Sequence, residues 1–351
     1  MKAELPTAEE LQPSVALLRR LLDELDRMLL GRTELHRLVV VALLSRGHVL
    51  LEGVPGVGKT TLIKALGQLL QLDFRRVQFT PDLMPSDILG SYILQESETG
   101  GRDLVFRPGP IFTNLLLADE INRASPKTQS ALLEAMQERQ VTLLGTTRPL
   151  PEPFFVLASQ NPIELEGTYP LPEAQLDRFL FKLLVEQVSE DVLVGIISTR
   201  RRGEPPMPCW ALSREELAKL YQLMERIYLP RAVSQYIARL VAATHPQSER
   251  APPLVKEYVT YGSSPRGAIA LAEAARAHAL LSGRPTVGFE DVRAVAIPAL
   301  QHRVLLAYKA RLDRVTPTQV IEQLLEHVPA VPLDLPEDLT IQNTNPNARE
   351  S

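Results

Sequence analysis

The chain has 351 residues, more than a single domain usually contains, which predicts two domains. Its composition is that of an ordinary globular protein, with 45% hydrophobic and 23% charged residues, and its formal charge of -4 disfavours nucleic acid as the main ligand. Because it has one cysteine (Cys209), no basic and apolar leader at its start and no apolar run of membrane-spanning length, we expect a cytoplasmic protein without a disulfide or a membrane span.

Two helices are predicted before the first strand. Leucines alternate with charged residues at helical spacing over 11–30, which predicts an amphipathic helix, and we assign residues 1–30 to an N-terminal helical segment. The turn Gly31-Arg32 ends this helix, and the helical spacing returns over 35–44. The short apolar run at 48–51 is typical of a buried strand, so we expect a sheet to begin there.

Residues 53–60 read Gly-Val-Pro-Gly-Val-Gly-Lys-Thr and lie between this strand and a predicted helix. In that position backbone N–H groups turn inward on phosphates, Lys59 reaches the β and γ oxygens, and the Thr60 hydroxyl can bind Mg²⁺. A glycine-rich turn without a ligand is the alternative, but the flanking strand and helix favour a nucleotide, and we expect ATP and Mg²⁺. The expected contacts are Gly53, Val54, Pro55, Gly56, Val57, Gly58, Lys59, Thr60 and Thr61, with Gly31 and Arg32 beside the adenine.

A second strand is predicted over 74–79, followed by a segment rich in proline, serine, aspartate and glycine from 80 to 110. Two β-prone pieces, 91–94 and 104–106, flank a turn at 99–101 and predict a hairpin inserted at the edge of the sheet. An insertion of this length, 86–108, usually serves contact or regulation. A surface hairpin without such a role is the alternative.

Four apolar residues at 115–118 predict a strand that is buried on both faces and ends in Asp119-Glu120. Ligands of parallel α/β sheets bind at the carboxyl ends of strands. Asp119 is therefore placed to hold Mg²⁺ next to Thr60, and Glu120 to polarise the water that attacks the γ-phosphate. The alternative is that the two acids cap the following helix, but a cap does not require a buried strand before it.

A helix is predicted over 126–138, and strands are predicted over 141–144 and 154–158. The second of these strands ends near Asn161. If it lies beside the strand that carries Asp119, the Asn161 amide can orient the attacking water through its donor and acceptor atoms. Asparagine before proline is also a common start of a turn, which is the alternative reading of Asn161.

In their order and in their residues, these motifs closely resemble those of the MoxR family of AAA+ ATPases over most of the chain. Related families such as the magnesium-chelatase ATPase subunits share the hairpin insertion but are less similar. The motifs that carry the resemblance are QFTPDLMPSD at 78–87, GPIF at 109–112, ADEINR at 118–123, AMQERQV at 135–141 and NPIELEGTYPLPEAQLDRF at 161–179.

The resemblance gives family roles to the site residues and adds three arginines. Lys59 and Thr60 match Walker A, Asp119 and Glu120 match Walker B, and Asn161 matches sensor 1.

Arg178 matches the proposed arginine finger, which reaches the γ-phosphate held by the neighbouring subunit and neutralises charge in the transition state. A salt bridge with Asp177 or a nearby glutamate is the alternative role for Arg178. Arg123 is a competing candidate for the subunit interface. Arg266 matches sensor 2, which is expected to move toward the phosphates, with a plain surface position as its alternative.

The second domain is predicted to be helical. A proline-rich linker at 203–209 precedes helical spacing from 213 onward, and we assign 210–330 to a small AAA+ lid. In this lid Gly267 replaces the alanine that is more usual in the family, which is expected to loosen the start of the helix over 268–281. The tail at 331–351 is rich in proline, asparagine and acids and is expected to fray.

The expected fold is α/β: an AAA+ P-loop αβα sandwich over 31–202 with a parallel sheet and an inserted β-hairpin, followed by an all-α lid domain. The resemblance implies an ATPase that assembles as a ring, expected to be a hexamer, with the nucleotide between the core and its own lid. It also implies chaperone-like action on a client or adaptor protein, often one with a von Willebrand factor A domain, to mature it or to load metal or cofactor. The alternatives are a magnesium-chelatase-type motor, a nucleotide-gated scaffold with little turnover, and a DNA-dependent motor, which the acidic balance disfavours.

Overall fold

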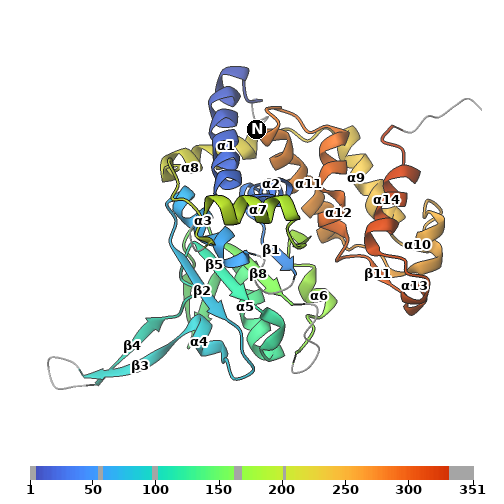
Figure 1. Cartoon of the computed structure of the whole chain (residues 1–351). Helices are drawn as coiled ribbons and strands as arrows, with labels where there is room; N and C mark the ends of the chain where they lie inside the picture. The colour runs from blue at the N-terminus through green and yellow to red at the C-terminus, as the bar shows by residue number, and fades with distance from the viewer. Residues whose placement is uncertain (1–4, 54–57, 97–101, 162–167, 201–202, 332–351) are drawn as a thin grey trace, which may run out of the picture.

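The centre of the fold is a parallel sheet of five strands in the order β2-β5-β8-β1-β9 (Figure 1). The computed structural model describes residues 5–53, 58–96, 102–161, 168–200 and 203–331. The strands are β1 (Val49–Glu52), β2 (Phe74–Gln78), β5 (Leu115–Asp119), β8 (Phe155–Gln160) and β9 (Phe181–Leu184). The strands predicted at 48–51, 74–79, 115–118 and 154–158 are confirmed, whereas β9 had no sequence prediction.

Helices cover both faces of this sheet. They are α1 (Ala8–Met28), α2 (Thr33–Leu44) and α3 (Lys59–Leu70) on one side and α5 (Pro126–Glu138) on the other. Because alternate residues of a strand point to opposite faces, Leu115 and Leu117 of β5 pack with α1 to α3, while Leu116 and Ala118 pack with α5. The expected αβα sandwich is confirmed, and the full burial of β5 explains its continuous apolar sequence.

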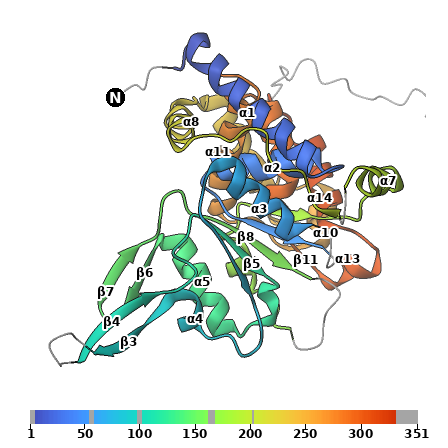
Figure 2. The same ribbon diagram turned by 60° about the vertical axis from the view of Figure 1, so that its left-hand side comes forward.

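Two hairpins project from the core on the same side (Figure 2). The predicted hairpin consists of β3 (Gly90–Glu96) and β4 (Arg102–Pro108), and its turn at 97–101 lies outside the described residues. The hairpin follows β2, an edge strand of the main sheet, as predicted, and among the described residues β3 and β4 pair with each other and do not extend that sheet. A second hairpin, β6 (Gln140–Leu143) with β7 (Thr146–Pro149), was predicted only in its first strand. Arg148 of β7 stacks on the ring of Phe106 at 4.0 Å and so joins the two hairpins.

The C-terminal part of the chain is a helical domain that packs beside α1 and α2 in one continuous apolar cluster with them. A short antiparallel pair, β10 (Val259–Tyr261) with β11 (Leu305–Leu306), is added to the predicted all-helical lid. None of the described helices is long and apolar enough to cross a lipid bilayer. The helices are α8 (Arg214–Arg226), α9 (Arg231–Ala243), α10 (Pro253–Tyr258), α11 (Pro265–Leu281), α12 (Phe289–Leu300), α13 (Tyr308–Leu312) and α14 (Pro317–His327).

The structure shows close packing around Gly267 that the sequence did not reveal. Gly267 lies in the first turn of α11, and a Cβ atom added there would collide with Ser263 Oγ and lie 3.1 Å from Arg303 Cδ. The helix start is instead fixed by Ser264, whose hydroxyl accepts a hydrogen bond from Arg266 N at 3.1 Å. A larger residue at position 267 would therefore have to displace the Ser263 hydroxyl and the Arg303 side chain.

Candidate nucleotide site

Three neighbouring strands bring the predicted site residues to one edge of the sheet. β5, β8 and β1 are adjacent and parallel, so their carboxyl ends meet at the same edge. Glu120 follows β5, Asn161 follows β8, and Gly53 follows β1 and donates from its N–H to Gln160 O at 3.3 Å. Asn161 is buried, and its carbonyl accepts from Asn122 Nδ2 at 3.4 Å. The expectation that the strand ending near Asn161 lies beside the Asp119 strand is confirmed.

The described part of the phosphate loop has the backbone that the motif requires. Gly58 caps α3 in the left-handed region at φ 88°, where nothing lies within 4 Å of an added Cβ. Lys59 is buried at the first position of α3, and its Nζ donates to Gly53 O at 2.8 Å. Burial lowers the pKa of Lys59, while the nearby Asp119 and Glu120 oppose that shift. Thr60 and Thr61 follow Lys59 in the helix, and the predicted contacts at 54–57 lie outside the described residues.

Asp119 is held by side chains from both neighbouring strands. Its Oδ1 accepts from Ser159 Oγ at 2.5 Å, and its Oδ2 accepts from Arg76 Nε at 3.1 Å and Nη2 at 2.6 Å. Gln78 is the register partner of Asp119 in β2, so Arg76, two residues earlier, lies on the same face of that strand. The guanidinium therefore neutralises the carboxylate that was predicted to hold Mg²⁺.

Glu120 has its own set of partners and an unusual backbone. It adopts the left-handed region at φ 56°, and its N–H donates to Ser159 Oγ at 2.8 Å. Its Oε2 accepts from Gln78 Nε2 at 2.8 Å and from Arg123 Nη1 at 3.0 Å. A non-glycine residue in this region is strained and persists only where its surroundings hold it, which is common at functional sites. Arg123, the alternative candidate for the subunit interface, is thus an ion-pair partner of Glu120 in its own chain.

A cavity of about 450 Å³ begins at Gly58, Lys59 and Thr61 and extends away from the sheet. Arg32 lines it, and its Nη2 donates to Glu186 O at 3.1 Å. Gly31 lies in the turn at φ 76°, where an added Cβ would collide with Val192 of α7 (Glu190–Thr199). The wall is formed by the end of α1, the start of α2, the segment 185–188 and α7, which crosses the front of the core in Figure 1.

The expectation that the nucleotide lies between the core and its own lid stays a prediction. Among the described residues that line this cavity, none comes after Gly203, so the helical domain takes no part in the wall. The described lining on that side comes from the segment 185–188 and from α7.

These residues fit a triphosphate with its metal ion. The N-terminus of the 12-residue helix α3 favours anions, the αL glycine leaves its N–H accessible, and Lys59 is available at the same end. No group of three or more His, Cys, Asp or Glu side chains that could hold a metal ion occurs in the part of the chain that the structure describes. A divalent cation would therefore depend on the Thr60 hydroxyl, Asp119 and the phosphates together.

Comparison with known proteins agrees with this geometry. The model of the ATPase family associated with various cellular activities (AAA) matches residues 48–181, and the model of the AAA lid domain matches residues 253–324. The chain is 44% identical to Chaperone MoxR1 of Mycobacterium tuberculosis over 92% of this chain and 84% of that protein. It is 32% identical to Protein MoxR of Methylorubrum extorquens over 88% of this chain and 93% of that protein. The chain belongs to the MoxR family of AAA+ ATPases.

A solved structure supports the same assignment at the level of the fold. The crystal structure of an inferred ATPase from Cytophaga hutchinsonii superposes with a TM-score of 0.81 and 36% sequence identity. The match covers 92% of this chain and 97% of that one, so it includes the core and the helical domain together. The AAA+ fold is therefore shown for both parts of this MoxR-family chain.

The two remaining predicted arginines of this MoxR-family chain lie far from its own Lys59. Arg178 and Arg266 line a different cavity, of about 370 Å³, together with Gly47 and His48 at the amino end of β1. Lys59 lies beyond the carboxyl end of β1, and a strand of four residues spans roughly 13 Å. Arg266 therefore does not lie at the phosphate end of its own sheet in this structure, and its movement toward the phosphates stays a prediction. Its Nη2 instead donates to Gln137 Oε1 at 3.3 Å, and Arg178 Nη1 donates to Leu133 O at 2.8 Å.

The cavity that holds Arg178 and Arg266 is strongly cationic. Five arginines face two carboxylates, which leaves a surplus of three positive charges. His48 adds none at neutral pH, because burial lowers its pKa to about 4. Such a surplus suits a polyanion. The charged lining residues are Arg46, Arg139, Arg178, Arg266, Arg303, Asp177 and Glu273.

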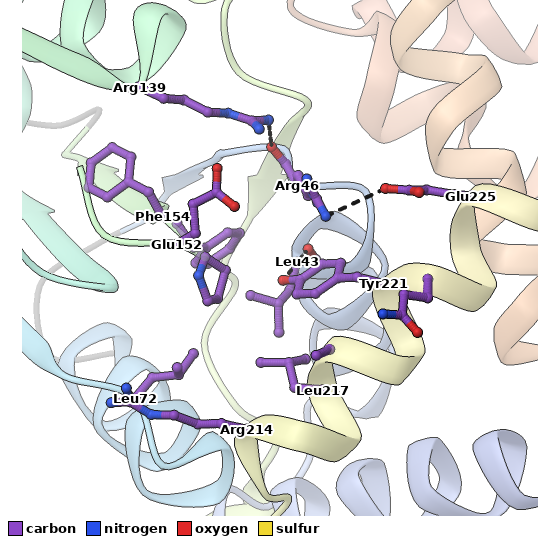
Figure 3. A pocket seen from close by; sticks show the side chains of 14 residues that line it. Leu43, Arg46, Leu72, Arg139, Glu152, Phe154, Arg214, Leu217, Tyr221 and Glu225 are labelled. Atoms are coloured by element: carbon purple, nitrogen blue, oxygen red, sulfur yellow. Dashed lines mark hydrogen bonds and ion pairs between the residues drawn. The ribbon is translucent and has the colours of Figure 1, made fainter. Parts of the chain in front are cut away.

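A third cavity, of about 320 Å³, lies near the amino ends of β2 and β8 and had no sequence prediction (Figure 3). Its floor is apolar, and Tyr221 of α8 donates from its hydroxyl to Leu43 O at 3.2 Å. Two of its charged side chains, Arg46 and Glu225, form an ion pair at 3.6 Å, and Arg139 donates to the backbone carbonyl of Arg46 at 3.4 Å. The cavity therefore joins the core to α8 at the end of the sheet opposite the nucleotide site.

Arg76 is the site residue that sequence reasoning missed. We predict that Arg76→Gln raises the apparent Mg²⁺ affinity of the ATP-bound protein about fivefold, because a partly exposed ion pair of this kind contributes up to about 1 kcal/mol. The removed cation competes with Mg²⁺ for Asp119 Oδ2. Titrating Mg²⁺ against the binding of a fluorescent ATP analogue measures the change.

The matched control is Arg75→Gln, since Arg75 is the exposed neighbour on β2 and makes no contact with Asp119. Weaker Mg²⁺ binding by Arg76→Gln, with Arg75→Gln unchanged, would show that the Arg76 guanidinium contacts the phosphates and does not compete with the metal.

Proposed function

We propose that this MoxR-family protein binds ATP with Mg²⁺ and hydrolyses it to ADP and phosphate. The observation that carries the proposal is the convergence of Lys59, Asp119, Glu120 and Asn161 at the carboxyl ends of three adjacent strands. In this arrangement Lys59 and the N-terminus of α3 neutralise the phosphates, while Thr60 and Asp119 hold the metal ion. Magnesium supplies charge neutralisation on the phosphate oxygens.

The side chains of this chain divide the hydrolytic work. Glu120 is the group that accepts the proton of the attacking water, and its carboxylate is held in place by Gln78 and Arg123. Asn161 orients that water with its amide, since it follows the strand next to Glu120. The left-handed backbone of Glu120 turns the chain away from the sheet, which leaves the carboxylate at the end of β5.

We propose that the protein acts as a ring, expected to be a hexamer, in which Arg178 and Arg266 complete the site of the adjacent subunit. The support is that the nucleotide cavity and the cationic cavity lie at opposite ends of β1, so one subunit cannot use both on the same nucleotide. Two different surfaces that fit each other form a heterologous contact, and such contacts close into rings when the rotation permits. Nucleotide turnover would then change the angle between subunits.

We further propose that this motion acts, chaperone-like, on a client or adaptor protein, including partners with a von Willebrand factor A domain, to mature them or to load metal or cofactor. This proposal is supported by the membership of the chain in the MoxR family and by its similarity to a relative that is named a chaperone, Chaperone MoxR1. The projecting β3–β4 hairpin is a candidate contact, because the cross-strand pair Leu94 and Leu104 is largely exposed. We place this activity in the cytoplasm.

The proposed division of the chain follows the same argument. It comprises an N-terminal helix at 1–30, an ATPase core at 31–202, a linker at 203–209, a lid at 210–330 and a tail at 331–351. The two matched family segments, 48–181 and 253–324, fall inside the proposed core and lid.

The direct test is isothermal titration calorimetry of ATP with Mg²⁺ against the purified protein. The expected result is saturable binding that Lys59→Ala weakens by at least about tenfold, since it removes a charged contact to the phosphates. Lys64→Ala is the matched control, because Lys64 is an exposed lysine on the same helix. A folded wild-type protein that takes up no adenine nucleotide in the presence of Mg²⁺ would contradict the proposal.

A further inference from the structure

The part of the nucleotide cavity beyond Lys59 is shaped for a base. Its walls are largely apolar, with Leu29 from the segment after α1, Leu35 from α2 and Leu193 from α7. Four polar side chains interrupt this lining: Arg32, His36, Gln187 and Arg200. A mainly apolar pocket with a few placed polar groups is the usual form of a small-ligand site, in which the polar groups decide the orientation and identity of the ligand.

His36 is held in one tautomer by a carboxylate. Its side chain is fully buried, and its Nδ1 lies 2.5 Å from Asp26 Oδ1 of α1. A carboxylate only accepts hydrogen bonds, so the Nδ1 atom carries the proton and donates it to Asp26. Burial lowers the pKa of His36, and the nearby Arg32 acts in the same direction, while Asp26 opposes the shift. The ring is therefore neutral at pH 7, and its Nε2 atom presents a lone pair.

That lone pair has no partner in the part of the chain that the structure describes. A buried acceptor without a hydrogen bond destabilises the fold, so native proteins usually supply a partner. A second His–Asp pair in the same molecule shows the completed arrangement. His278 Nδ1 lies 2.6 Å from Asp291 Oδ1, and its Nε2 accepts from Arg37 Nη2 at 2.9 Å. At His36 the described residues supply the carboxylate for Nδ1 but no hydrogen-bond donor for Nε2. His36 also lines the nucleotide cavity.

We propose that His36 Nε2 accepts a hydrogen bond from the 6-amino group of a bound adenine, and that His36 thereby selects adenine over purines with a 6-oxo group. The proposal rests on the proposed nucleotide-binding function. A 6-amino group is a donor, which matches the lone pair of Nε2, whereas a 6-oxo group would place one acceptor against another. Asp26 is the positioning residue, because it fixes which nitrogen carries the proton.

Three triphosphates test the proposal by calorimetry in the presence of Mg²⁺: ATP, purine riboside triphosphate, which lacks the 6-amino group, and inosine triphosphate, which has a 6-oxo group. The wild-type protein is expected to bind ATP about tenfold more tightly than purine riboside triphosphate, the value of one good hydrogen bond. In His36→Leu the two affinities are expected to become equal. The matched control is His278→Leu, which removes a ring from the other His–Asp pair and is expected to keep the tenfold preference.

Asp26→Asn provides a second, independent variant with almost unchanged volume. The asparagine amide can donate to His36 Nδ1, which allows the tautomer with the proton on Nε2, and this tautomer favours an acceptor at position 6. The expected result is that the preference for ATP over inosine triphosphate falls about tenfold compared with the wild-type protein. Thermal melts of all variants confirm that each binding measurement is made on folded protein.

Two outcomes separate this inference from the function on which it rests. If the wild-type protein binds ATP but His36→Leu and Asp26→Asn keep the wild-type discrimination, the role of His36 is overturned while nucleotide binding stands. If the folded wild-type protein binds none of the three triphosphates, the proposed function fails, and the inference fails with it.

Discussion

Glu120→Gln is expected to lower ATP turnover by roughly 10²-fold to 10³-fold, the usual contribution of a general base. The amide has the shape of the carboxylate but cannot accept the proton of the attacking water. Nucleotide binding is expected to persist, since Lys59 and the N-terminus of α3 are untouched. Phosphate release measures turnover, and retention of radiolabelled ATP on the purified protein measures binding.

The control is Glu134→Gln, which makes the same chemical change at an exposed position of α5, away from the strand ends. Turnover by Glu120→Gln at the wild-type rate would show that another group activates the water. Low turnover by the wild-type protein itself, with tight ATP binding, would favour the alternative of a nucleotide-gated scaffold. Stable rings in the Glu120→Gln protein with ATP would support the assembly that completes the site.

The sheet and its active edge could be predicted because their signals are local. A strand buried on both faces appears as an unbroken apolar run, and β5 is buried at all five positions. The helix predicted over 126–138 has the observed bounds of α5, since proline begins it and the left-handed Arg139 ends it. Because the carboxyl ends of parallel strands lie at one edge of the sheet, the proximity of the motif residues can be predicted without knowing the long-range packing.

Arg76 could not be found in this way, although a weak signal exists. Arg76 and Gln78 are two positions apart in a predicted strand, so they share a face. Which residues they face depends on the pairing of β2 with β5, and the sequence did not specify that Gln78 is opposite Asp119. Strand order in a parallel sheet is set by the crossover connections and not by either strand alone.

The position of Arg266 relative to the sheet could not be predicted from the sequence, because it depends on how two domains pack. The end of α12 is bound to the segment before β9: Arg303 Nε donates to Asp177 Oδ1 at 2.8 Å, and His302 Nε2 lies 3.1 Å from Phe179 O. These contacts hold the helical domain, and α11 with it, at the amino end of β1. The family resemblance predicts a role for Arg266, but it carries no information about which end of the sheet the domain covers.

Arg178→Ala is expected to lower turnover by about 10³-fold while nucleotide binding persists, because an arginine that neutralises transition-state charge contributes 10³-fold to 10⁵-fold in related NTPases. The contacts of the Arg178 side chain leave part of its guanidinium free to bind a ligand. Nη1 donates to Leu133 O, but the buried Nε has no partner among the described residues. Phosphate release and calorimetry separate the two effects, and Arg75→Ala, on the exposed side of β2, is the control.

The decisive measurement mixes two inactive proteins. Arg178→Ala subunits keep Glu120, and Glu120→Gln subunits keep Arg178. The nucleotide site of an Arg178→Ala subunit is therefore complete when its neighbour is a Glu120→Gln subunit that supplies Arg178. In a random equal mixture such contacts make up about a quarter of all interfaces in a closed ring. Turnover is therefore expected to recover to about a quarter of the wild-type value. If native mass spectrometry shows mixed rings but turnover does not recover, Arg178 acts within its own subunit or only in the fold, and the separation of the two cavities by β1 makes the fold the simpler explanation.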